Sequence, residues 1–239
     1  AHLGLAFSFI QEGNFKRGFK EHEWNLKKQG KYAEKLRSLL KNNNIERKRI
    51  LLVPEGGLGD TLQFIRYAER LKKMDAHVIV AAQPPLLPLL SSISFIDELI
   101  PSRGHNPPHD ARVTLMSLPA TFHDTPESIP QNVPYLSADA TLIKKWKKRI
   151  EKDAKFKVGL CWQASVSNDE SRLPCARRGI PLAAFKQLTK LPISLYSLQK
   201  HEGLEQLEHF PRNALTFFED LDEHSGAFMD TAALIMHMD

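Results

Sequence analysis

Cysteine is scarce in this chain, with two residues among 239. Cys161 lies in an apolar run and Cys175 in a polar stretch, without the paired spacing that a zinc site or a disulfide framework needs. No run approaches the roughly twenty apolar residues that cross a bilayer, and the start lacks a charged segment followed by an apolar core. We therefore expect a cytoplasmic protein without a transmembrane segment.

The chain also has no large excess of one charge. Lys and Arg number 33 against 28 Asp and Glu, a net charge of +5. This mild excess suits anionic ligands but does not argue for nucleic acid. Many of the cations lie between residues 144 and 157, which we interpret as a solvated helix face. The first residue is not Met, so we expect a piece of a longer protein.

One segment joins a glycine turn to an acidic residue. An apolar run at 49–54 is followed by Gly56, Gly57 and Gly59 and then by Asp60. In a parallel sheet, ligands bind beyond the carboxyl ends of the strands, and such a turn lets them approach the backbone. The phosphate-loop Lys-Ser/Thr and the G-x-G-x-x-G spacing are both missing. Asp60 is therefore interpreted as a helix N-cap, as a ligand-contacting carboxylate, or as both.

Apolar runs alternate with amphipathic segments, which predicts an α/β fold with parallel strands covered on both faces. In the first half we expect strands at 49–54, 77–82, 98–101 and 112–116 and helices at 60–73 and 84–91. In the second half we expect strands at 157–162, 193–198 and 214–218 and helices at 140–152, 181–190, 203–210 and 229–237.

The first 28 residues predict a helical hairpin broken at Gly13-Asn14, and a further helix is expected at 32–41. A helix of small apolar residues, a Gly-Asn-Phe turn and an aromatic-bearing helix resemble the last unit of a tetratricopeptide array. One unit cannot bury its own faces. We expect the hairpin to pack on the following domain as a cap, or on earlier repeats.

Several short blocks follow one another in the order of a known family. They are Glu55–Arg66, Gln83–Leu87, Ser117–Pro119, Val133–Leu136, Val158–Trp162, Arg178–Leu182, Ser197–Lys200 and Asp230–Leu234. Together they resemble the glycosyltransferase portion of bacterial tetratricopeptide-containing proteins, which is similar to heptosyltransferases of glycosyltransferase family 9. Each block is weak alone, and their number and order carry the resemblance.

The resemblance implies a GT-B enzyme with two Rossmann-like domains, the first for the acceptor and the second for a nucleotide-sugar. We expect a helical cap at 1–45, an acceptor domain at 46–153 and a donor domain at 154–239. The implied activity is an inverting transfer to a carbohydrate or protein acceptor, with no metal or other cofactor. Because the family continues past a helix like 230–235 into a donor-phosphate loop, we expect an incomplete donor domain.

Asp60 falls on the family's Gly-Asp position, which implies the general base for the acceptor hydroxyl. An inverting transfer needs one carboxylate near that oxygen, and the end of the first strand is where one can reach it. Gly57, Gly59 and Gln63 are expected to lie along the acceptor. Arg66 is expected to form a salt bridge.

On the donor side, a metal-free site needs cations and backbone amides to stabilise the departing diphosphate. Arg177 and Arg178 match the family's basic position, and the planar guanidinium suits a diphosphate. Gln199 and Lys200 follow the next strand and are expected to contact the nucleotide or its sugar. Simple surface solvation remains the alternative for each cation.

Two other functions stay open. The first is a non-catalytic scaffold, in which a tetratricopeptide-like hairpin binds a protein partner and the transferase-like part is degenerate. The second is a nucleotide-sugar epimerase, against which the missing dinucleotide fingerprint argues.

Overall fold

The computed structural model describes residues 2–26, 32–164 and 179–239, and it divides the chain into two compact units, Ala1–Ser137 and Ala138–Asp239. Each unit contains one parallel sheet, so the expected α/β class is confirmed. Among the described helices, none has the length and apolar character needed to span a lipid bilayer.

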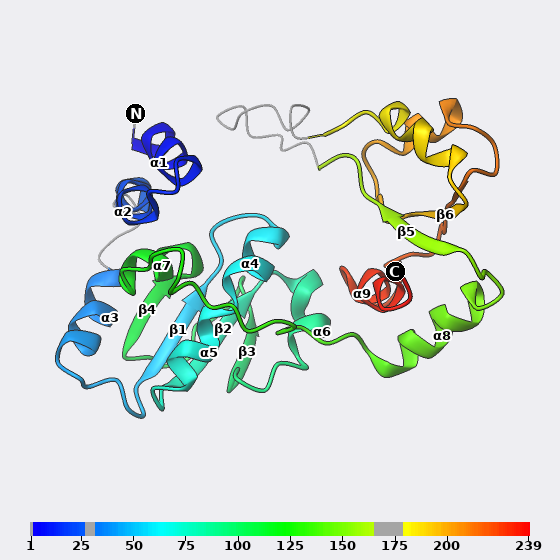
Figure 1. The fold of residues 1–239 in the computed structure, drawn as a ribbon. Helices are drawn as coiled ribbons and strands as arrows, with labels where there is room; N and C mark the ends of the chain where they lie inside the picture. Colours follow the sequence, from blue (N-terminus) through cyan, green and yellow to red (C-terminus); the bar gives the residue numbers. More distant parts are fainter. Residues whose placement is uncertain (1, 27–31, 165–178) are drawn as a thin grey trace. The chain divides into compact units, whose positions relative to one another are not determined.

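The first unit is built on a four-stranded parallel sheet in the order β3-β2-β1-β4 (Figure 1). Its central strands are apolar and buried over nearly their whole length, because helices and connecting segments cover them. The strands are β1 (Arg49–Val53), β2 (His77–Ala82), β3 (Glu98–Pro101) and β4 (Ala111–Thr114).

Short helices precede, connect and follow these strands. Three of them contact the sheet, α3 at β4, α5 at β2 and α6 at β3. They are α3 (Tyr32–Lys41), α4 (Leu58–Phe64), α5 (Tyr67–Lys72), η2 (Pro84–Leu86), α6 (Leu87–Leu90), η3 (Leu115–Ser117) and α7 (Leu118–Thr121).

The N-terminal hairpin consists of α1 (His2–Gln11) and α2 (Phe15–Leu26). Gly18 allows the two helices to approach closely, because a Cβ there would lie 2.5 Å from Ile10 Cγ1 and 3.1 Å from the Ala6 carbonyl oxygen. Helix α2 contacts α7, beside which it lies in Figure 1. The hairpin therefore packs against a helix of the sheet domain in its own unit, one of the two expected arrangements.

The helix expected at 60–73 differs from prediction at both its start and its middle. Helix α4 begins at Leu58, and a turn at Ile65 and Arg66 separates it from α5. Both turn residues keep right-handed torsions, but the Ala68 amide bonds to the Ile65 carbonyl, only three residues back. This three-residue bond tightens the helix locally, in the manner of a 3₁₀ turn. The Arg66 side chain also donates to the Gln63 carbonyl.

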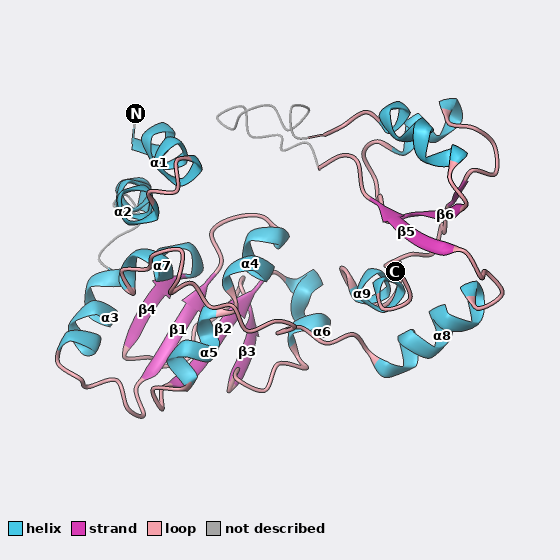
Figure 2. Cartoon of the chain, viewed as in Figure 1, coloured by secondary structure: helices cyan, strands magenta, loops and turns pink. Residues whose placement is uncertain are grey.

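The second unit is built on a three-stranded parallel sheet in the order β5-β6-β7. Helices α8 and α9 lie together on one side of this sheet and the 3₁₀ helices lie on the other (Figure 2). The elements are α8 (Ala140–Ile150), β5 (Phe156–Leu160), η5 (Leu182–Lys190), β6 (Ile193–Ser197), η6 (Leu204–His209), β7 (Leu215–Thr216) and α9 (Met229–Ile235).

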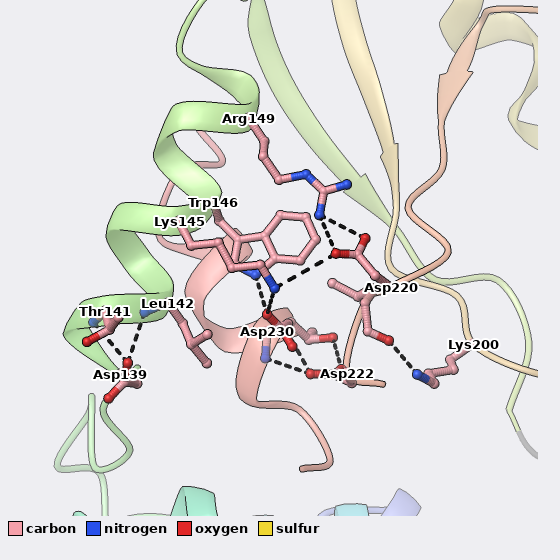
Figure 3. Close-up of polar contacts among 12 residues, drawn as sticks. Asp139, Thr141, Leu142, Lys145, Trp146, Arg149, Lys200, Asp220, Asp222 and Asp230 are labelled. Carbon is pink, nitrogen blue, oxygen red and sulfur yellow. Dashed lines mark hydrogen bonds and ion pairs between the residues drawn. The ribbon is translucent and has the colours of Figure 1, made fainter. Parts of the chain in front are cut away.

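Helix α8 belongs to the second unit, so the boundary lies at Ser137–Ala138 and not at the expected 153–154. The reason is a buried contact with α9: Trp146 Nε1 donates to Asp230 Oδ1 over 2.6 Å, and Lys145 Nζ pairs with the same oxygen at 3.1 Å (Figure 3). Trp146 is fully buried and Asp230 is 1% exposed. Arg149 binds Asp220 beside them.

Candidate functional site

The glycine turn lies where β1 ends, and the carboxylate of Asp60 folds back over it. Asp60 is the third residue of α4, and its Oδ2 accepts the Gly57 amide at 2.7 Å. The Asp60 side chain therefore caps the N-terminus of α4 from the first turn of the helix. The N-cap residue itself is Gly57 and not Asp60. The other carboxylate oxygen, Oδ1, forms no hydrogen bond to a described residue.

Gly56 is the glycine that this arrangement requires. A Cβ at Gly56 would lie 2.1 Å from Asp60 Oδ2, whereas one at Gly57 would meet it at 3.7 Å and one at Gly59 would meet nothing within 4 Å. The predicted acceptor-side glycines, Gly57 and Gly59, are both exposed at the turn. Only Gly56 makes room for the acid.

A second strand end holds the turn in place. Thr61 Oγ1 donates to Gln83 Oε1 at 2.9 Å, and Gln83 Nε2 donates to the Gly56 carbonyl at 3.2 Å. Thr61 is buried in α4 and Gln83 directly follows β2. Two adjacent strand ends are thus joined through one glutamine, which fixes the position of the turn relative to the sheet edge.

Asp60 lines a pocket of about 280 Å³ within the first unit. The sheet domain contributes Asp60, Gln63, Phe64, Arg66, Tyr67, Met116 and Ile129. The helical hairpin contributes Phe7, Ile10, Phe15, Phe19 and His22. The structure therefore brings the predicted residues Asp60 and Gln63 together and places the hairpin beside them, a contact that local spacing in the sequence could not reveal.

His22 and Arg66 are two further titratable groups that line this pocket. Burial lowers the pKa of His22, and the negative charge of Asp60 opposes part of this shift. Arg66 forms no salt bridge within the described part of the chain, contrary to expectation. Its guanidinium lies over the Tyr135 ring at 4.7 Å and donates to Tyr135 Oη at 3.1 Å and to the Pro130 carbonyl at 3.2 Å.

Glu55 is a second acid near Asp60 that the sequence analysis did not single out. Both carboxyl oxygens are buried, and neither has a hydrogen-bond partner among the described residues. Burial raises the pKa of Glu55 to about 7, and the charge of Asp60 adds to the rise. The Thr114 hydroxyl and the Met116 amide lower it only in part, since neither reaches hydrogen-bond geometry. An acid between a buried strand and a glycine turn was the signal that could have identified it.

In the second unit, Gln199 links two strand ends and has no hydrogen-bonding group to spare. Its Oε1 accepts the amides of Trp162 at 3.0 Å and Gln163 at 2.9 Å. Its Nε2 donates to the carbonyls of Gln163 at 2.9 Å and Glu202 at 2.7 Å. The side chain is 4% exposed, so the predicted donor contact would require one of these bonds to break.

Lys200 is likewise engaged, pairing with Glu223 at 2.8 Å and donating to the Leu221 carbonyl. It lines a small pocket of about 70 Å³ that also includes Phe217 and Glu219. The predicted donor cations Arg177 and Arg178 lie outside the described residues. No group of three His, Cys, Asp or Glu side chains in the described ranges is arranged to hold a metal ion.

The pocket of the first unit offers a side-chain amide, an imidazole and one carboxylate, whose second oxygen bonds to no described residue, inside largely apolar walls. Such an arrangement can accept a proton from a bound hydroxyl group. Comparisons with models of protein families, with curated proteins and with solved structures found no match for this chain.

Proposed function

We propose that the chain is part of a GT-B glycosyltransferase that transfers a sugar from a nucleotide-sugar to an acceptor hydroxyl, with Asp60 as the general base. The observation that carries the proposal is the position of Asp60, which lines a pocket beside the end of β1. Two units with parallel sheets are compatible with this fold. The heptosyltransferase-like sequence blocks support it independently.

The proposed step is a direct displacement. Asp60 takes the proton of the acceptor hydroxyl while the acceptor oxygen forms a bond to the anomeric carbon of the sugar. The bond from that carbon to the diphosphate breaks, and the nucleoside diphosphate leaves with the electron pair. Asp60 has one oxygen held by the Gly57 amide, which fixes the carboxylate and leaves the other oxygen for the acceptor.

Replacing Asp60→Asn tests this role with little structural change, because the amide oxygen can still accept the Gly57 N–H. We expect turnover to fall by about 10²- to 10⁴-fold, the range for loss of a general base. Nucleoside diphosphate release from a panel of nucleotide-sugars, measured on the full-length natural protein with a panel of acceptors, gives the rate. Asp75→Asn, at an exposed turn before β2, is the matched control.

Equal turnover of the wild type and the Asp60→Asn variant would remove Asp60 from the mechanism. A second candidate function, protein binding by the hairpin, is favoured by the exposure of Leu3 at 37% and Leu5 at 46%. It predicts no transfer with any donor, together with loss of a binding partner when the hairpin surface is changed.

A further inference from the structure

We propose that the pocket beside Asp60 binds an uncharged hydroxyl compound that also carries an aromatic or larger alkyl group, and that the hairpin supplies the wall for that group. Naming this ligand the acceptor rests on the proposed function. The binding preference itself follows from the chemistry of the pocket.

The walls are mostly apolar. Eight of the twelve lining side chains are aromatic or aliphatic, and four of these eight come from the hairpin: Phe7, Ile10, Phe15 and Phe19. Phe7 is 46% exposed, so it retains apolar surface that a ligand can cover. Burying such surface against an aromatic group is favourable in water, whereas it contributes little to binding a bare polyol.

The pocket has too few uncommitted hydrogen-bonding groups to hold a free sugar by polar contacts alone. Arg66 is already engaged with Tyr135 and two backbone carbonyls, and one oxygen of Asp60 holds the glycine turn. Within the described ranges, the polar groups of the lining that remain without a hydrogen bond are Asp60 Oδ1, the Gln63 amide and the His22 ring. These groups can bind one hydroxyl and a neighbouring polar atom, so the remaining hydroxyls of a glycoside stay in water and add little to its affinity.

The charges also balance. The lining contains one carboxylate, Asp60, and one guanidinium, Arg66. Burial lowers the pKa of His22 and raises that of Tyr67, which keeps both side chains neutral. A pocket with equal and opposite charges complements a neutral ligand better than a phosphate or an ammonium group.

The test compares phenyl β-glucoside with methyl β-glucoside, which differ only in the group next to the glycosidic oxygen. Isothermal titration calorimetry on the whole protein is expected to show phenyl β-glucoside binding at least about tenfold more tightly. The side-chain amide signal of Gln63 in a nitrogen-15 NMR spectrum should shift on binding, which places the ligand in this pocket.

Phe7→Ser is expected to reduce the affinity for the phenyl compound about tenfold and to leave that for the methyl compound unchanged. Leu5→Ser is the matched control, since Leu5 lies on the same helix, is also 46% exposed and does not line the pocket. Equal affinities for the two glucosides in the wild type, or an unmoved Gln63 signal, would overturn the proposal without recourse to any variant.

The outcome is separate from that of the proposed function. If the phenyl preference and its dependence on Phe7 hold while no nucleotide-sugar is ever consumed, the ligand class stands and the transferase proposal fails. If transfer occurs without an aromatic or alkyl preference, the transferase proposal stands and the ligand class is wrong.

Discussion

At the scale of single residues, the site combines two acids in different environments. Asp60 has one oxygen on a backbone amide and lines a pocket, whereas Glu55 is enclosed without a hydrogen-bond partner. Enclosure favours the uncharged form of Glu55. An acid whose pKa is raised by burial is a feature of many sites that move protons.

The raised pKa of Glu55, from 4.5 to about 7, gives stability a defined pH dependence. The folded state binds the proton more tightly, so its contribution is complete below about pH 4.5 and is lost as the pH rises through about 7. We expect the free energy of unfolding to fall by about 1–3 kcal/mol over this window in the wild type. Glu55→Gln should flatten this part of the profile.

Denaturant unfolding of the wild type and the variant at several pH values measures the difference. Glu46→Gln, at an exposed side chain, should leave the wild-type profile unchanged. A Glu55→Gln profile with the full wild-type slope would show that Glu55 does not titrate in this range.

At the scale of secondary-structure elements, the connection between β1 and α4 depends on one missing side chain. Gly56→Ala would place a Cβ 2.1 Å from Asp60 Oδ2 and so displace the carboxylate from the Gly57 amide. We expect this change to destabilise the protein by about 1–3 kcal/mol through the clash and the lost cap. Gly59→Ala, with open space inside a helix, should be neutral or stabilising by up to about 1 kcal/mol.

Thermal or denaturant unfolding of the two variants provides the comparison, and the Gly57 amide shift in NMR reports whether the cap is broken. Similar stabilities for both variants would mean that the turn tolerates a side chain at either position and that the carboxylate moves without cost.

The elements that the sequence predicts best are those with continuous apolar runs. The strands at 77–82 and 98–101 have the expected bounds. For β2 the reason is that a buried parallel strand is apolar along nearly its whole length. The helices expected at 181–190 and 203–210 are 3₁₀ helices, at Leu182–Lys190 and Leu204–His209. In the first of these segments Leu182, Phe185 and Leu188 pack into the core three residues apart, the spacing of a 3₁₀ helix, but a spacing of three also occurs on the apolar face of an α-helix.

The site was predicted only as far as local sequence reaches. Asp60 and Gln63 lie in the pocket because one short helix carries both. His22 and Phe7 reach the same pocket from a hairpin distant in sequence, and such a tertiary contact has no local signal. Gln199 was predicted as a ligand contact because it follows a strand. Its side-chain amide instead forms hydrogen bonds to backbone groups.

At the scale of the whole molecule, the chain consists of two compact units whose boundary is set by the packing of α8. Trp146 and Ile150 of this helix share a buried cluster with Leu234 of α9 and Tyr196 of β6. The hydrogen bond from Trp146 to Asp230 adds a polar contact that would be expensive to leave unpaired. Helix α8 is therefore held by elements that follow it in sequence.

Hydrogen exchange measured by mass spectrometry tests this boundary. Leu234→Ala should cost about 2–5 kcal/mol and accelerate exchange in α8 as well as α9, with no effect on β1 and β2. Ile79→Ala, at a fully buried position of β2, should have the reverse effect and serves as the matched variant. Faster exchange of α8 in the Ile79→Ala protein would place that helix with the first unit.

Two different segments of the first unit build the pocket, one that positions the carboxylate and one that forms an apolar wall. The carboxylate is positioned by a turn between a strand and a helix, while four of the eight apolar side chains that line the pocket come from the hairpin. Exchange of aromatic residues in α1 and α2 can therefore retune the choice of ligand without disturbing the turn. Among proteins that diverge from this chain, we expect the substitutions that change the choice of ligand to occur first in the hairpin.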